Sequence, residues 1–99
     1  MLIVAGSFRV DPSFQGSYIN ERLHMMTRCR SEQGCLEYIY SSDPIEQGRV
    51  VLFERWESEA AFMAHLSAEK SFRAIEPPRS LPASGEVRIY DIAGVRPIP

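Results

Sequence analysis

The side chains best suited to chemistry lie where an expected strand runs straight into an expected helix, in the middle of the chain. Trp56, the only tryptophan, stands at the end of the strand, and His65 follows nine residues later. An indole offers an aromatic plane and one N–H donor, and an imidazole can exchange a proton near neutral pH. We therefore expect a pocket here, with His65 as general base. The alternatives are a core tryptophan and a helix histidine with one edge in water.

Four further side chains could complete this pocket. Tyr38 and Tyr40 share one face of an expected strand, so their phenols could converge on a ligand or simply line a core. Arg73 could stabilise a phenolate by charge, or it could lie over Phe72 without a function. Ser7 could donate a hydrogen bond to a ligand from the first strand, although a hydroxyl bonded to backbone is the more common arrangement.

Composition and spacing exclude several other functions. The sequence has no glycine-rich nucleotide loop and no His, Cys or carboxylate set with metal-ligand spacing, so we expect no cofactor and no metal. A net charge of −2 gives no reason to expect binding to nucleic acid or to an anionic membrane. Cys29 and Cys35 are expected to be reduced and mostly buried, as in a cytoplasmic protein. The apolar N-terminus lacks the basic region of a signal peptide.

Hydrophobic periodicity predicts four strands and three helices. The strands are expected at Leu2–Val10, Cys35–Ser42, Arg49–Trp56 and Glu86–Val95, and the helices at Pro12–Ser31, from Ser58 onward, and at Ser71–Glu76. Asp11 and Ser58 have the chemistry of helix N-caps, Gly34 supplies a helix stop, and Pro77-Pro78 must end the last helix.

This order of elements predicts the fold. The succession β-α-β-β-α-(α)-β, in one domain over residues 1–99, fits an α+β ferredoxin-like sandwich with an antiparallel sheet and helices on one face. The strands carry large apolar residues on both faces, and a free second face would expose more apolar surface than a monomer usually tolerates. We therefore expect a homodimer in which two sheets meet in a dimeric α+β barrel.

Three stretches carry a resemblance to a known family. The segments GCLEYIYSSDP, RVVLFERWESEAAFMAHL and SFRAI resemble the antibiotic biosynthesis monooxygenases, which are small dimeric α+β-barrel proteins. The matching features are a glycine that opens the second strand, a strand that ends in W-E-S, the A-H-L helix and an aromatic-Arg pair, within residues 2–92.

The resemblance implies a cofactor-free oxygenase that acts on phenolic or quinol-like rings. Trp56, Tyr40 and Arg73 match the family's strand-end tryptophan, pocket tyrosine and short-helix arginine, and with His65 they form the expected catalytic set. The expected substrate-binding set is Tyr38, Ser7, Phe62, Leu52 and Phe72. Leu52 and Phe62 stand where some polyketide oxygenases have asparagine and tyrosine. Ser71 stands where many members carry a histidine, so the resemblance predicts no axial ligand for haem.

Oxygen reacts poorly with closed-shell organic molecules unless a cofactor or an electron-rich anion takes part. We therefore expect a cytoplasmic homodimeric monooxygenase that deprotonates a small aromatic or quinone-like substrate in a dry cavity and lets the anion react with O2. The alternatives are an isomerase that uses His65 as a proton shuttle and a non-catalytic dimer that binds a hydrophobic ligand.

Overall fold

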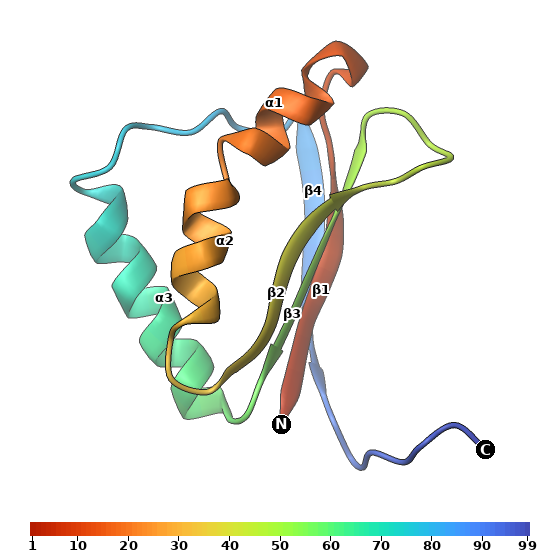
Figure 1. Cartoon of the computed structure of the whole chain (residues 1–99), viewed down its shortest axis with the longest axis vertical. Helices are drawn as coiled ribbons and strands as arrows, with labels where there is room; N and C mark the ends of the chain where they lie inside the picture. Colours follow the sequence, from red (N-terminus) through yellow and green to blue (C-terminus); the bar gives the residue numbers. More distant parts are fainter.

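The computed structural model describes all residues from 1 to 99 and shows an α+β ferredoxin-like fold (Figure 1). Its four-stranded antiparallel sheet has the order β2-β3-β1-β4, and the helices cover one face. The strands are β1 (Leu2–Arg9), β2 (Cys35–Ser42), β3 (Arg49–Trp56) and β4 (Ser84–Asp91); the helices are the 3-10 helix η1 (Pro12–Phe14), α1 (Gln15–Asn20), α2 (Leu23–Arg30) and α3 (Glu59–Arg73). The predicted fold class is confirmed. None of these helices combines the length and the apolar composition that crossing a bilayer requires.

The predicted helix boundaries at Asp11, Ser58 and Gly34 are confirmed. The Asp11 carboxylate accepts the backbone N–H of Ser13 at 2.8 Å, and the Ser58 hydroxyl accepts that of Ala61 at 3.1 Å. Gly34 adopts φ +82° after α2, a conformation that residues with a Cβ rarely adopt. These three boundaries could be predicted from the sequence because each depends on a hydrogen bond or a backbone angle within one turn.

The first helical region differs from the single helix expected over Pro12–Ser31. It is divided into η1, α1 and α2, with a turn at residues 21–22. The Arg22 guanidinium donates to the carbonyl of Tyr18 at 2.9 Å, and the Arg22 backbone N–H bonds to Ile19 instead. The backbone N–H of Arg22 thus shifts from the i−4 to the i−3 carbonyl at this turn, and the helix breaks where the guanidinium bonds to the carbonyl of Tyr18.

Two C-terminal boundaries also differ from the expectation. No separate helix forms over Ser71–Glu76, because α3 continues without a breaker to Arg73 and ends in a turn before Pro77-Pro78. The last strand ends at Asp91 rather than Val95, because its partner β1 begins at Leu2 and only one further hydrogen bond, from the N–H of Ile92 to the carbonyl of Met1, follows.

The helix-facing side of the sheet holds the core, and the other side is partly exposed. Leu2, Val4, Val50, Leu52 and Trp56 are buried beneath the helices. The opposite side, here called the far face, presents Ile3, Ala5, Ile39, Val51 and Phe53 at intermediate or high exposure. A β-bulge between Cys35 and Glu37 also brings Cys35 opposite Trp56, on the helix side, where strict alternation placed it on the far face.

Candidate functional site

A cavity of about 530 Å³ lies between the helix-facing side of the sheet and the helices. Strands β2 and β3 contribute its polar floor, α3 contributes one wall, and the loop after α3 contributes a run of prolines. It is lined by Phe8, Tyr18, Arg22, Met25, Tyr38, Tyr40, Glu54, His65, Leu66, Glu69, Arg73, Glu76, Pro77, Pro78, Arg79, Leu81 and Pro82. This lining combines aromatic surface with charged groups of both signs, which suits a small polar aromatic molecule.

Three acid–base groups, Glu32, His65 and Glu54, lie in a row that ends at the cavity. The Nδ1 atom of His65 lies 3.0 Å from Glu32, and its Nε2 atom lies 3.9 Å from Glu54. Glu54 accepts a 2.9 Å hydrogen bond from the indole N–H of Trp56. The imidazole is therefore held between two carboxylates, and one of them, Glu54, lines the cavity. This arrangement can take up a proton from a ligand and pass it on.

The carboxyl group of Glu54 has a shifted pKa. Burial raises the pKa of Glu54 to about 7, and the negative charges of Glu69 and Glu32 act in the same direction, against the Trp56 hydrogen bond. No arginine or lysine forms an ion pair with it. A carboxyl with this pKa is half ionised near neutral pH, which is the range where a general base works best.

The tyrosines of the cavity are neutral hydrogen-bonding groups. Burial raises the pKa of Tyr40 to about 12, and it raises the pKa values of Tyr38 and Tyr18 as well. Arg22 is buried, and its guanidinium lies 3.5 Å from the centre of the Tyr18 ring. The cavity thus has a fixed positive charge at its aromatic wall, with the Glu21 carboxylate 3.6 Å from the guanidinium.

The structure brings together four of the residues proposed from the sequence. Tyr38, Tyr40, His65 and Arg73 all line the cavity. Trp56 is fully buried behind Glu54, and its ring centre is 4.7 Å from that of His65.

The other four proposed residues lie elsewhere. Leu52 and Phe62 belong to the core, and Phe72 packs against the Arg28 guanidinium at 3.9 Å. Ser7 lies on the far face with Ala5 and Val51, across the sheet from the cavity.

Sequence reasoning missed Glu54, Glu32 and Arg22. The sequence did contain a sign of the role of Glu54, because strand alternation places it on the same buried side of β3 as Leu52 and Trp56. Glu32 and Arg22 could not be recognised in this way. Glu32 contacts His65 and Arg22 bonds to Ser80, and both of these partners are distant in sequence.

The sequence model of the antibiotic biosynthesis monooxygenase family matches residues 1–77. An uncharacterized protein of Synechocystis is 30% identical over 93 residues, and the chain spans 63% of that protein's length.

Solved structures share the fold at low sequence identity. A Deinococcus radiodurans protein described as a candidate antibiotic biosynthesis monooxygenase superposes with a TM-score of 0.77 at 20% identity, covering 99% of this chain and 98% of its own. The heme-degrader MhuD of Mycobacterium tuberculosis superposes with a TM-score of 0.78 at 12% identity, covering 96% and 98%.

Proposed function

Because this chain belongs to the antibiotic biosynthesis monooxygenase family, we propose that it is a cofactor-independent monooxygenase. Its substrate is a small phenolic or quinol-like aromatic compound, and its co-substrate is O2. The observation that carries the proposal is the Glu54 carboxyl, buried at a cavity wall, facing His65 and paired with no cation. A base of this kind can form the electron-rich anion that lets an organic molecule react with oxygen directly.

The reaction begins with proton transfer. A substrate hydroxyl within hydrogen-bond reach of Glu54 gives its proton to the carboxylate, and His65, 3.9 Å away, can relay it toward Glu32. The resulting phenolate delocalises its charge to a ring carbon, which forms the new bond to O2. Loss of water from the hydroperoxide leaves a carbonyl on that carbon. The substrate thus supplies all four electrons, one oxygen atom enters the product and the other leaves as water.

Positive charge in the cavity stabilises the anion. Arg22 is fixed by hydrogen bonds to the carbonyls of Tyr18 and Ser80, at 2.9 and 2.7 Å, and Arg73 lines the cavity without an ion-pair partner. The neutral phenols of Tyr38 and Tyr40 can donate hydrogen bonds to the substrate oxygens. Trp56 acts as a positioning residue, because its N–H holds the Glu54 carboxylate.

The residues of the cavity do not fit haem. Its only imidazole is His65, whose two ring nitrogens face the carboxylates of Glu32 and Glu54. Nδ1 lies only 3.0 Å from the Glu32 carboxylate, which leaves no space for a porphyrin between them, and Nε2 faces the Glu54 carboxylate at 3.9 Å.

A second copy of the chain is the partner that we propose for the far face. Phe53, Val51 and Ile39 lie there without helices above them, and an ion pair between Arg55 and Glu37 lies beside them. Burial of this surface against an identical sheet would remove the apolar patch from water. We propose the cytoplasm as location, in line with the free thiols of the chain.

The test is oxygen uptake with a dihydroxynaphthalene or an anthrone-like substrate, followed by mass analysis of product formed under ¹⁸O2. We expect one labelled oxygen atom per product molecule, and strongly reduced turnover in Glu54→Gln. The matched control is Glu57→Gln, at an exposed carboxylate outside the cavity. Product that carries unlabelled oxygen or is only isomerised, or tight binding without a product, would contradict the proposal and favour the isomerase or the ligand-binding alternative.

A further inference from the structure

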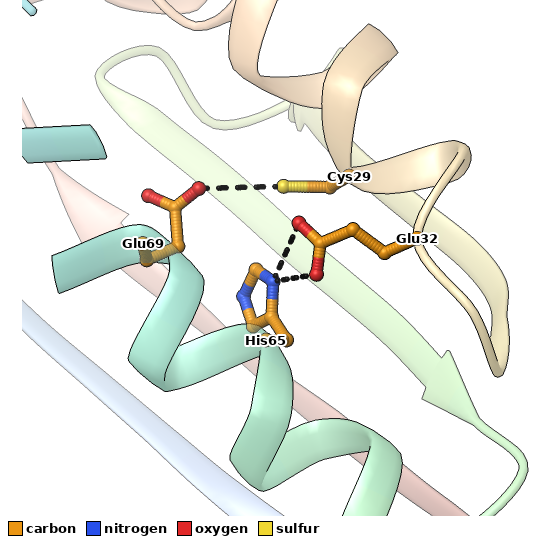
Figure 2. A group of neighbouring side chains, drawn as sticks. All are labelled: Cys29, Glu32, His65 and Glu69. Atoms are coloured by element: carbon orange, nitrogen blue, oxygen red, sulfur yellow. Dashed lines mark hydrogen bonds and ion pairs between the residues drawn. The ribbon is translucent and has the colours of Figure 1, made fainter. Parts of the chain in front are cut away.

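We propose that Cys29, Glu32, His65 and Glu69 form a site for a divalent transition metal, with Zn²⁺ as the best match. One ligand atom from each of the four residues lies within 4.8 Å of all the others. Figure 2 shows the four side chains pointing toward one another from α2, from the turn that follows it and from α3. This site lies at the back of the cavity, and the inference is argued from the cluster alone. A bound ion would occupy the Nδ1–Glu32 contact of the proposed proton relay, so that relay belongs to the metal-free chain.

The secondary structure explains why the four groups converge. Cys29 lies in the last turn of α2, and Glu32 follows just after that helix. His65 and Glu69 are four residues apart on α3, so they lie on one face, one turn apart. Two ligands from one helix end and two from a facing helix can enclose an ion without distorting either backbone.

The donor types and their spacing suit zinc. Zn²⁺ takes thiolate, imidazole and carboxylate ligands in a tetrahedron, with bonds of about 2.0–2.3 Å that place its ligands about 3.5 Å apart. The Cys29 sulfur lies 3.6 Å from Glu69, and Nδ1 of His65 lies 3.0 Å from Glu32. These two distances between ligand atoms are close to the ligand–ligand distance of a tetrahedral zinc site. The other ligand atoms, which lie up to 4.8 Å apart, would have to move by about 1 Å.

The neighbours of the cluster resemble the outer shell of a metal site. A histidine that binds a metal usually directs its other nitrogen to a carboxylate, and Nε2 of His65 faces Glu54 at 3.9 Å. A ligating carboxylate is usually hydrogen-bonded as well, and Glu69 is contacted by the guanidinium groups of Arg28 and Arg79. The Nδ1 atom, on the Glu32 side, is therefore the nitrogen that we assign to the metal.

The local charge supports a cation at this place. Glu32, Glu54, Glu69 and Glu76 have side chains that are 20% exposed or less. The two guanidinium groups of Arg28 and Arg79 both contact Glu69 and Glu76, which leaves Glu32 and Glu54 with His65 alone. Buried carboxylates are costly unless a cation is near. A divalent ion between Glu32, Glu69 and the Cys29 thiolate would supply the missing positive charge.

The experiment is a titration of the chelator-treated full chain with Zn²⁺ alone by calorimetry, and with Co²⁺ followed by absorbance. We expect one saturable site per chain and a Co²⁺–thiolate charge-transfer band. Co²⁺ should also quench Trp56, the only tryptophan, whose ring centre lies 4.7 Å from that of His65.

Matched substitutions locate the site. Cys29→Ser should weaken Zn²⁺ binding by more than about tenfold and abolish the band, while Cys35→Ser, at the other free cysteine, should change neither. His65→Gln should weaken binding similarly, while His24→Gln, on the exposed side of α2, should not. Because Cys29 and His65 are buried and their variants could misfold, Glu32→Gln at a half-buried position provides an independent loss of affinity.

Two results would overturn the proposal. The first is the absence of saturable Zn²⁺ binding by a folded wild-type chain. The second is binding that the Cys29, His65 and Glu32 variants retain. Either result leaves oxygen uptake by the metal-free protein untouched, so failure of this inference and failure of the proposed function are distinguishable.

Discussion

Replacing Glu54 by glutamine is expected to make the protein more stable at alkaline pH while it removes activity. Glu54 is 4% exposed, and burial raises the pKa of its carboxyl from the ordinary value of 4.5 to about 7. Between these two values the folded state holds a proton that the unfolded state has already lost. The free energy of unfolding therefore falls as pH rises through this window, and the full loss is present above pH 7.

The magnitude follows from the two pKa values. A pKa difference from 4.5 to about 7 corresponds to at most about 3 kcal/mol of stability lost above pH 7. Glutamine has nearly the same shape, carries no charge, and its carbonyl can still accept the Trp56 indole hydrogen bond. The stability of Glu54→Gln relative to wild type should thus increase by about 2–3 kcal/mol between about pH 5 and about pH 8.5.

Urea unfolding at these two pH values, followed by the fluorescence of the single buried tryptophan, measures this difference. Comparing the variant with wild type at each pH cancels the titration of groups that both proteins share. Glu57→Gln serves as the control and should show no pH-dependent difference, because Glu57 is exposed. A Glu54→Gln difference that is constant with pH, or that favours the variant more at acidic pH, would refute the assignment of a raised carboxyl pKa.

Three further predictions concern the indole, haem and the far face. Trp56→Phe removes the hydrogen bond that lowers the pKa of Glu54, so the pH at which activity is half-maximal should move upward while the dimer persists; an unchanged pH profile would argue against positioning by the indole. Haem titration should give no sharp, stoichiometric Soret shift, and such a shift would show that the site does hold haem. Light scattering should find a wild-type dimer that Phe53→Glu dissociates and that Met63→Glu, on exposed α3 surface, leaves intact; a monomeric wild type would contradict the proposed assembly.

The parts of the fold that sequence predicted best are governed by local chemistry. The Asp11 and Ser58 caps and the stop at Gly34 each depend on hydrogen bonds or dihedral angles within a few residues. The break at Arg22 was not predictable in this way, because its guanidinium also bonds to Ser80, far along the chain. A uniform apolar periodicity through residues 12–31 therefore gave one helix where the structure has three segments.

The candidate site was predictable only in part for the same reason. Strand parity correctly places Tyr38 and Tyr40 on one side, and both line the cavity. The indole of Trp56 drew attention to the right strand, yet the cavity-lining group is Glu54, two residues earlier. The cluster around Cys29 escaped notice because its ligands come from the end of α2, the turn after it and α3, whose packing no sequence spacing reveals.

The pH dependence of oxygen consumption, measured side by side for wild type and Glu54→Gln with one dihydroxynaphthalene substrate, tests the central claim most directly. For the wild type we predict a rate that rises as the Glu54 carboxyl ionises, with a midpoint near its pKa of about 7. The variant should still bind the compound but consume oxygen no faster than the buffer control at any pH. Equal rates for the two proteins would show that Glu54 does not generate the reactive anion.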